Sequence, residues 1–480
     1  MMVASAPPDS AFDVAILGGG VGGYVAAIRA AQLGMKVAVI DKESLGGTCL
    51  IWGCIPTKAL HHTAEVWRTV HDAAEVGVML GDGAAPVLDW EKMMAHKDGV
   101  VRNLVRGVEG LMKGNGVTVF KGIGTLVTDG LPHRLVVTDP DGGTREVEAT
   151  HVVLATGSRP AVPPIPGLDL PGVITSNDML TLTRQPRTLA VIGGGIIGME
   201  FATIFAALGT QVSVIELLPN VLTGVEPELV RRVVPMFRKA GVTITTGAKV
   251  TGVTWGDEDD LAVHYTTDKG EQTVEAEAVL VAVGRVPNTK DAWAENVPVA
   301  LNGRAILVDH DLNTSVPNVY AIGDVALLPQ LAHTASTQGE VLMERLAGKD
   351  SHYDPSVIPN CVFTLPEMSG VGLTEEQAKE RHGDGVRTGV FPFAAIGRAQ
   401  ILGETQGVVK LIADADGKLL GAHILGPRAS DLIAELTLAL KMGATAADIA
   451  HTIHAHPTLP EAIHEAALAL VNGKPIHALR

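Results

Sequence analysis

A pair of cysteines near the N terminus offers the clearest chemistry in the chain. Cys49 and Cys54 lie five positions apart in the run Leu45-Gly-Gly-Thr-Cys-Leu-Ile-Trp-Gly-Cys-Ile-Pro-Thr-Lys58. A disulfide between them would close a small ring that constrains the unfolded chain little, so stability is a poor reason for it. Two thiols held close together exchange readily with a disulfide substrate and can pass electrons onward. Lys58 can share a helical face with Cys54 and favour a thiolate.

Other interpretations of the cysteines are open at this point. Zinc binding is one, although Cys-x4-Cys without a second Cys or His pair nearby is poor ligand spacing, and we expect no metal. Inert burial is another. The third cysteine, Cys361, lies in a strand-like run. We expect it to be a core residue rather than a nucleophile.

A histidine and a glutamate near the C terminus form a second chemical pair. His456 and Glu461 are five positions apart, and Pro457 fixes the turn between them. A carboxylate bonded to one ring nitrogen orients the imidazole and raises its basicity, which suits a base that takes a proton from a dithiol near neutral pH. Because His451, His454 and His464 lie close by in the sequence, a solvent-exposed group of histidines or a metal site are the alternatives.

The elements that must position these side chains come from an internal repeat. The segment that begins at Phe12 aligns without a gap with the segment that begins at Arg187. Each predicts a strand, a glycine turn, a helix and a second strand that ends in an acid. The equivalent positions are Gly18, Gly20, Gly23 and Asp41 in the first copy and Gly193, Gly195, Gly198 and Glu216 in the second.

The repeat predicts two dinucleotide sites. The glycines permit a tight turn, a close pyrophosphate and close helix packing, and the acid can accept from the ribose hydroxyls. Two such sites on one chain suggest a flavin and a nicotinamide. No Lys or Arg occurs from Thr210 to Gly224, so NAD is favoured over NADP. Two packing turns in an α/β fold are the plainer alternative.

Composition sets the frame for these motifs. The 480 residues are 46% hydrophobic and 19% charged, which predicts two to four packed domains. A net charge of −16 disfavours binding to nucleic acid or an anionic membrane. Three cysteines exclude a disulfide scaffold. Residues 1–10 resemble a frayed leader rather than a signal or transit peptide, so we expect a cytoplasmic α/β protein.

The cysteine run resembles the active site of the pyridine nucleotide–disulfide oxidoreductase family, and the likeness extends over about residues 11 to 475. Further family-like runs follow in chain order. They are Ala155-Thr-Gly-Ser-Arg-Pro160, the second glycine unit, Val281-Ala-Val-Gly-Arg-Val-Pro-Asn288, Val319-Tyr-Ala-Ile-Gly-Asp324, Leu331-Ala-His333, Gly421-Ala-His-Ile-Leu-Gly-Pro427 and His454-Ala-His-Pro-Thr-Leu-Pro-Glu461.

The resemblance implies two Rossmann-like domains, for FAD and NAD, and a C-terminal α+β dimerisation domain. The implied limits are residues 1–155 for FAD, 156–280 for NAD, 281–352 completing the FAD domain, and 353–480 for the interface. It is nearest to members that oxidise protein-bound dihydrolipoamide to lipoamide with NAD. The implied partners are a second copy of the chain and the lipoyl domains and core of a 2-oxo acid dehydrogenase complex.

Residue roles follow from the same resemblance. Cys49 exchanges with the lipoyl sulfurs, Cys54 lies nearer the flavin, and His456, with Glu461, is the base supplied by the opposite subunit. His454 is a secondary neighbour, and Pro460 stands where Ser is expected. The implied FAD residues are Gly18, Gly20, Gly23, Asp41, Lys58, Thr156, Gly157, Asp324 and Ala332, and the implied NAD residues are Gly193, Gly195, Gly198, Glu200, Glu216 and Gly284. Glu200 is also expected to pair with Lys58.

Three rival functions stay open. A reductase of glutathione disulfide would need an Arg for NADPH. A mercuric reductase would need a further Cys pair near the C terminus, where the chain has none. An assembly subunit without activity would have little use for the cysteine and histidine pairs.

Overall fold

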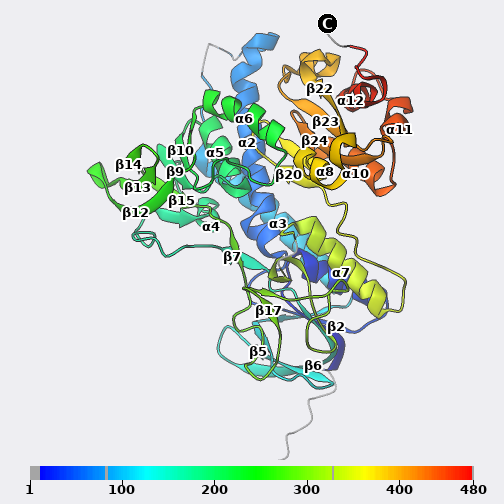
Figure 1. Cartoon of the computed structure of the whole chain (residues 1–480). Coiled ribbons are helices and arrows are strands. Elements are labelled where there is room, and N and C mark those ends of the chain that lie inside the picture. The colour runs from blue at the N-terminus through cyan, green and yellow to red at the C-terminus, as the bar shows by residue number, and fades with distance from the viewer. Residues whose placement is uncertain (1–10, 80, 82–84, 327–328, 478–480) are drawn as a thin grey trace, which may run out of the picture.

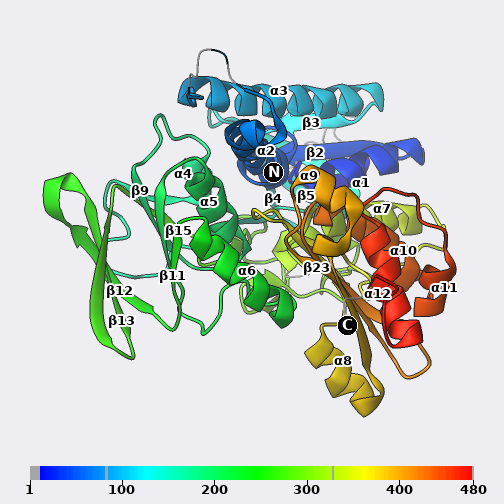
Figure 2. The ribbon, with the colours of Figure 1, turned by 90° about the horizontal axis from the view of Figure 1, so that it is seen from above.

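The computed structural model describes residues 11–79, 81, 85–326 and 329–477, so the expected leader at residues 1–10 lies outside the described residues. Three main sheets organise the chain, and the long helix α2 (Cys54–Asp72) runs between them (Figure 1). Seen from above, the β12–β13 ribbon and the C-terminal helices α10 and α12 lie at opposite sides of the molecule (Figure 2).

The first sheet has the strand order β3-β2-β1-β6-β5-β4, with β19 also paired to β6. Strands β1, β2, β3, β6 and β19 are parallel, and β4 and β5 form an antiparallel extension. β1 is buried on both faces, because Val14 and Ile16 join one core cluster and Ala15 and Leu17 another. The bounds are β1 Ala11–Leu17, β2 Val37–Asp41, β3 Thr118–Lys121, β4 Ile123–Leu126, β5 His133–Thr138, β6 Thr144–Leu154 and β19 Val319–Ala321.

Helices cover this sheet closely. α1 (Val21–Gln32) packs on α7 (Ala332–Leu346), and α3 (Trp90–Gly114) contacts both α1 and α2. A Cβ at Gly339 would lie 2.6 Å from the carbonyl oxygen of Gly22, so the two helices approach more closely there than a side chain allows. β19 and α7 come from the segment 281–352.

The second sheet is fully parallel, with the order β11-β10-β9-β15-β8. Helix α5 lies between this sheet and α2, which explains why its sequence is apolar all round. An antiparallel meander, β12-β13-β14, covers the other face. The bounds are β8 Val173–Thr175, α4 Ser176–Met179, β9 Thr188–Ile192, α5 Ile196–Ala207, β10 Gln211–Ile215, α6 Pro227–Lys239, β11 Val242–Thr245, β12 Lys249–Trp255, β13 Leu261–Thr267, β14 Gly270–Ala276 and β15 Ala278–Val281.

A short antiparallel ribbon connects the two parallel sheets. It consists of β7 (Ser158–Pro160) and β16 (Arg285–Pro287), and Ser158 lies opposite Pro287. A second ribbon, β17 (Leu301–Asn302) with β18 (Ala305–Ile306), follows it in the chain.

The third sheet is antiparallel, with the order β20-β21-β24-β23-β22. Strand β23 is buried along its whole length, and α10 packs on β21 and β24. The bounds are β20 Asn360–Val362, β21 Met368–Gly372, α8 Glu375–His382, β22 Arg387–Pro392, α9 Gly397–Leu402, β23 Val408–Ala413, β24 Leu419–Leu425, α10 Ala429–Lys441, α11 Ala446–His451 and α12 Glu461–Asn472.

The predicted fold class, two Rossmann-like units and a C-terminal α+β unit, is confirmed. In the described ranges, none of the helices combines the length and the apolar character that crossing a bilayer requires.

Candidate active site

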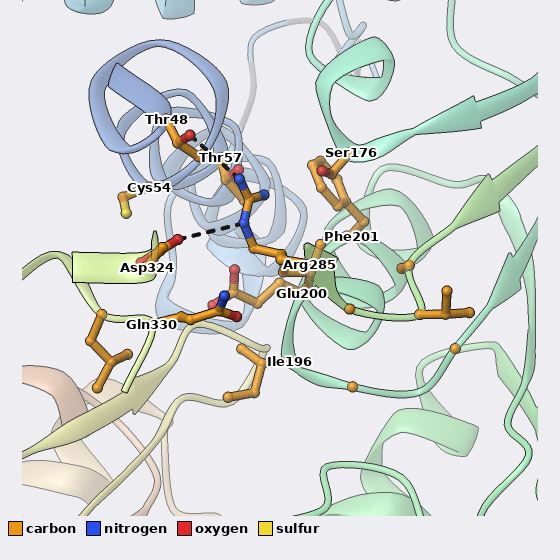
Figure 3. Close-up of a pocket in the computed structure, with 18 of the residues that line it drawn as sticks. Thr48, Cys54, Thr57, Ser176, Ile196, Glu200, Phe201, Arg285, Asp324 and Gln330 are labelled. Carbon is orange, nitrogen blue, oxygen red and sulfur yellow. Dashed lines mark hydrogen bonds and ion pairs between the residues drawn. The ribbon is translucent and has the colours of Figure 1, made fainter. Parts of the chain in front are cut away.

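A cavity of about 1360 Å³ lies where the three units meet (Figure 3). Both glycine loops, the cysteine turn and the start of β20 line its wall. Its volume exceeds the roughly 300–1,000 Å³ of an ordinary small-molecule pocket, and it is large enough for extended ligands. The repeat and the cysteines therefore open into one space.

The two glycine loops have the same backbone geometry. Gly18 has a φ of +106° and Gly193 a φ of +109°, which side-chain-bearing residues rarely adopt. A Cβ at Gly23 would overlap the carbonyl oxygen of Gly18, and a Cβ at Gly198 would overlap that of Gly193. The spacing of the repeat therefore reflects steric needs that recur in both copies.

The loops fit phosphate groups. Gly20 and Gly195 are the residues before α1 and α5, and neither helix start has a side-chain cap. Both glycines line the cavity, so the free N–H groups of two helix N-termini face it. The buried Nε2 of Gln330, which also lines the cavity, has no hydrogen-bond partner among the described residues. These donors suit the polar groups of two dinucleotides.

The two acids bond back onto their own loops. Asp41 accepts hydrogen bonds from the backbone N–H groups of Gly19 (2.5 Å) and Glu43 (2.7 Å). Glu216 accepts from Gly194 (2.5 Å) and Leu218 (2.7 Å) in the same way. Burial raises the pKa of Asp41 above its ordinary value. Each carboxylate is thus fixed beside its glycine turn, with lone pairs left for a ribose.

The cysteines lie in a π-helical turn, Thr48–Trp52, and at the first residue of α2. Both are present as thiols and are half-buried. The hydrogen bond between them raises the pKa of Cys49 and lowers the pKa of Cys54. Lys58 lowers the pKa of Cys54 further, against the effect of burial. Both effects favour ionisation of Cys54 over ionisation of Cys49.

The expected Lys58–Glu200 pair is present. Lys58 Nζ lies 2.9 Å and 3.1 Å from the two carboxylate oxygens of Glu200. The backbone N–H of Phe363 donates to Glu200 (2.9 Å), and the Lys58 ammonium lies 4.5 Å from the centre of the Phe363 ring. This half-buried ion pair joins α2, α5 and the C-terminal unit at the cavity wall.

The expected His456–Glu461 pair is also present. His456 Nδ1 lies 2.8 Å from Glu461 Oε1, and the backbone N–H of Thr458 donates to Oε2 (2.9 Å). Although burial opposes the change, these bonds lower the pKa of Glu461. Pro460 precedes the first residue of α12 and leaves the pair intact.

One chain alone does not bring His456 to the cysteines. The His456 side chain is 77% exposed, and it is absent from the wall of the cavity. His454 is mostly buried, and its Nε2 lies 2.9 Å from Glu435, which raises its pKa.

The remaining predicted residues divide into two groups. Gly157, Gly284, Asp324 and Ala332 line the cavity. Thr156 is outside the lining, and its hydroxyl donates to the carbonyl oxygen of Asn288 (2.6 Å).

The sequence interpretation gave no role to several residues at the cavity wall. Arg285 follows Gly284 in the family-like run Val281–Asn288, and only this place in the run could have pointed to it. Lys249 also lines the cavity, but it lies beyond the stretch from Thr210 to Gly224 on which the preference for NAD was based. Cys361 packs against the C-terminal core, as expected, yet also reaches the cavity, where burial raises its pKa to about 11.

Comparison with known proteins defines the class. Residues 12–339 match the family described as pyridine nucleotide-disulphide oxidoreductase, and residues 358–467 match the dimerisation domain of that family. The chain therefore belongs to the pyridine nucleotide-disulphide oxidoreductases.

Curated relatives narrow the type. Dihydrolipoyl dehydrogenase of Bacillus subtilis is 42% identical, over 97% of this chain and 99% of its own length. The enzyme of the same name from Halobacterium salinarum is 44% identical, over 97% and 98%. The mitochondrial one of Pisum sativum is 42% identical, over 97% and 92%. These relatives confirm the predicted oxidoreductase type, with FAD and NAD as cofactors.

A solved structure agrees with the fold. The Cu(II) complex of the HOCl-induced flavoprotein disulfide reductase RclA from Escherichia coli has a TM-score of 0.85 and 30% identity, and covers 95% of this chain and 98% of that one.

Proposed function

We propose that the chain oxidises dihydrolipoamide, carried by a lipoyl domain, to lipoamide and reduces NAD. The observation that carries the proposal is the Cys49–Cys54 pair, which opens into the cavity shared by both glycine loops. FAD, when bound, moves two electrons between a dithiol and a nicotinamide. The NAD preference is supported by Glu216, whose charge would repel the extra phosphate of NADP.

The chain's own residues handle the sulfurs and the protons. In the oxidised protein, a lipoyl thiolate attacks Cys49, and Cys54 leaves as a thiolate that Lys58 stabilises. The second lipoyl thiolate then displaces Cys49, which gives lipoamide and the dithiol protein. His456 takes the proton of the attacking lipoyl thiol at Nε2, because its Nδ1 is held by Glu461, and the proton of the second thiol ends on the displaced Cys49.

The binding residues and domain limits belong to the same proposal. The first glycine loop, Asp41, Lys58, Thr156, Gly157, Asp324 and Ala332 hold FAD, and the second loop, Glu200, Glu216 and Gly284 hold NAD. The four segments 1–155, 156–280, 281–352 and 353–480 are the units. A cytoplasmic location is part of the proposal, and cell fractionation tests it.

We infer a dimer in which each His456 serves the cavity of the second copy, within a 2-oxo acid dehydrogenase complex. The exposure of His456 supports this, as do apolar side chains of the same C-terminal unit that face solvent, Ile453 (97% exposed), Met442 (77%) and Leu438 (61%).

Anaerobic titration with dihydrolipoamide and with NADH tests the sulfur roles. We expect a long-wavelength charge-transfer band on reduction. Cys54→Ser should abolish the band, whereas Cys49→Ser should show it without a reductant. Identical behaviour of the two variants would contradict the assignment. NADPH oxidation with glutathione disulfide, or binding to a complex core without NADH formation, would favour the rival functions.

Subunit exchange tests the shared site. Inactive Cys49→Ser and His456→Gln dimers are mixed under conditions that exchange subunits. Activity should return, because a mixed dimer holds one complete site. No recovery despite exchange, measured with a tagged chain, would place His456 and Cys49 in the same subunit.

A further inference from the structure

Arg285, on β16, has no role in the proposed reaction, yet its side chain contacts both β7 and the cysteine turn at the cavity wall. Its Nε donates to the hydroxyl of Ser158 (2.7 Å), and its Nη2 donates to the carbonyl oxygen of Ser158 (2.7 Å). Nη2 also reaches the hydroxyl of Thr48 (3.4 Å) in the cysteine turn (Figure 3). The side chain is only 12% exposed, so these bonds hold a buried fork in one geometry.

The same side chain faces Asp324. Arg285 Nε lies 3.8 Å from Asp324 Oδ2, and the Ser158 hydroxyl donates to that oxygen (2.5 Å). Guanidinium, hydroxyl and carboxylate therefore form a continuous polar chain. It runs from the turn that carries Cys49 to the carboxylate proposed to bind the flavin.

The charge of Arg285 also bears on the thiolate. Burial lowers the pKa of Arg285, while the negative charges of Asp324 and Cys54 favour its charged form. An arginine stays protonated at any ordinary pH. Arg285 and Cys54 line the same cavity, so this fixed positive charge, in surroundings of low dielectric, favours the thiolate over the thiol.

We propose that Arg285 is a positioning residue that fixes the cysteine turn against Asp324 and keeps Cys54 ionised. The proposal rests on the proposed function in taking Cys54 as the thiolate and Asp324 as a flavin ligand. It adds a second cation to Lys58, from a strand of the connecting ribbon rather than from α2.

Arg285→Met in the holoenzyme removes both the fork and the charge. In a Cys49→Ser background, the charge-transfer absorbance is titrated with pH. The midpoint should rise by about one unit, which is about a tenfold smaller thiolate fraction below the midpoint. The alkylation rate of Cys54 by iodoacetamide, mapped by mass spectrometry, should rise with pH along the same displaced curve.

Arg159→Met is the matched control. Arg159 lies on the same ribbon and bonds to Asn288 Oδ1 (3.0 Å), but it is exposed and makes no bond to Thr48 or Asp324. It should titrate as the wild type does. Arg285→Lys keeps the charge without the fork, so it should restore the midpoint. Thr48→Val loses only the contact to the turn, and it should speed alkylation of Cys49 about twofold to fivefold with the Cys54 midpoint unchanged.

Two results would overturn the inference. One is a midpoint for Arg285→Met equal to that of Arg159→Met. The other, which can be measured even if Arg285→Met does not fold, is a Thr48→Val protein whose Cys49 reacts at the wild-type rate. A wild-type protein without the band would instead contradict the proposed function, and this inference with it.

Discussion

The two glycine-loop sites are built alike but covered differently. Both loops receive a hydrogen bond from the chain that follows the acid, since the backbone N–H of Gly46 donates to the carbonyl oxygen of Gly19 and that of Leu222 to Gly194 (2.8 Å each). Only at the first loop does that chain also reach the next glycine, because Gly46 forms a bridge with Gly20 and Gly47 lies 3.9 Å from the Cβ position of Gly20. At the second loop, no described atom beyond its chain neighbours and its own helix lies within 4 Å of the Cβ position of Gly195. Each glycine loop, together with the N-terminus of the helix after it, forms a cradle for a phosphate group. The segment that carries the cysteines covers the first cradle and leaves the second open.

The chains that follow the two acids begin alike and then diverge. Each first turns outward, with Leu217 63% and Lys42 65% exposed, and then packs back with a buried residue, Val221 or Leu45. Only the chain after Asp41 continues into the cysteine turn, where Leu50 is buried. A covered cradle suits a group that stays bound, and an open one suits a ligand that enters and leaves in each turnover. One sequence signature therefore serves both kinds of site, and the flanking chain decides between them.

The largest effect should come from filling the two cradles. Gly23→Ala and Gly198→Ala each place a methyl group against a loop carbonyl oxygen. We expect Gly23→Ala to purify with little or no flavin absorbance and less than about 1% activity. Gly198→Ala should stay yellow but show a KM for NAD raised by about a hundredfold. Loss of flavin from both variants, or from neither, would contradict the assignment of flavin to the first loop and NAD to the second.

A smaller effect is expected from the second acid. Glu216→Gln keeps the shape but loses the charge that strengthens the bonds from Gly194 and Leu218 and those to a ribose. A hydrogen bond to a charged group contributes about 1.5 kcal/mol or more, so the KM for NAD should rise about tenfold. The activity with NADP relative to NAD should increase, because a repulsive charge is gone.

Flavin content is the internal control for that variant and should not change. An unchanged KM for NAD, measured by initial rates at saturating dihydrolipoamide, would mean that Glu216 only stabilises its own loop.

The parts that could be predicted are those with a local cause. Gly18 and Gly193 are visible in the sequence because a left-handed backbone admits few other residues, and the acids follow at a fixed distance set by one helix and one strand. His456 and Glu461 were predictable as a pair because five residues and a short turn separate them. Each of these signals spans a few dozen residues at most.

The parts that escaped prediction depend on distant chain segments. Arg285 meets partners 127 and 237 positions away in the sequence. Lys249 reaches the second site from the start of β12, beyond the strand–helix–strand unit that the motif describes. No spacing rule connects such positions, because tertiary packing alone brings them together.

Flavin binding should depend on pH through Asp41, the acid at the first glycine loop. Because burial raises the folded-state pKa of Asp41, its carboxylate takes up a proton at a higher pH than an ordinary Asp. At neutral pH the buried negative charge of Asp41 therefore destabilises the flavin-free folded protein. This destabilisation disappears as the pH falls through the raised pKa and the carboxylate becomes neutral. The protonated acid loses its charge-assisted acceptance from the ribose, so flavin affinity should weaken over that same range.

Flavin fluorescence, followed from about pH 7 to pH 4, measures the release, since free flavin is brighter than bound flavin. Asp41→Asn should bind more weakly at neutral pH and with a flatter pH profile, while Glu216→Gln should follow the wild-type curve. A profile as steep in Asp41→Asn as in the wild type would assign the proton to another group.

The smallest effect should come from the exposed cation at the open site. Lys249 lines the second cradle at the solvent edge, so its attraction for the NAD phosphates is screened and worth less than about 1 kcal/mol. We expect Lys249→Ala to raise the KM for NAD about twofold to threefold at low salt, and the difference should vanish near 0.5 M salt, where the screening length is about 4 Å. Lys42→Ala is the matched control, because Lys42 follows the first acid and is 65% exposed, and removing it should leave the KM for NAD unchanged. Equal responses to the two substitutions would mean that NAD senses only the overall charge of the chain, whereas a loss confined to Lys249→Ala locates the attraction at the open cradle.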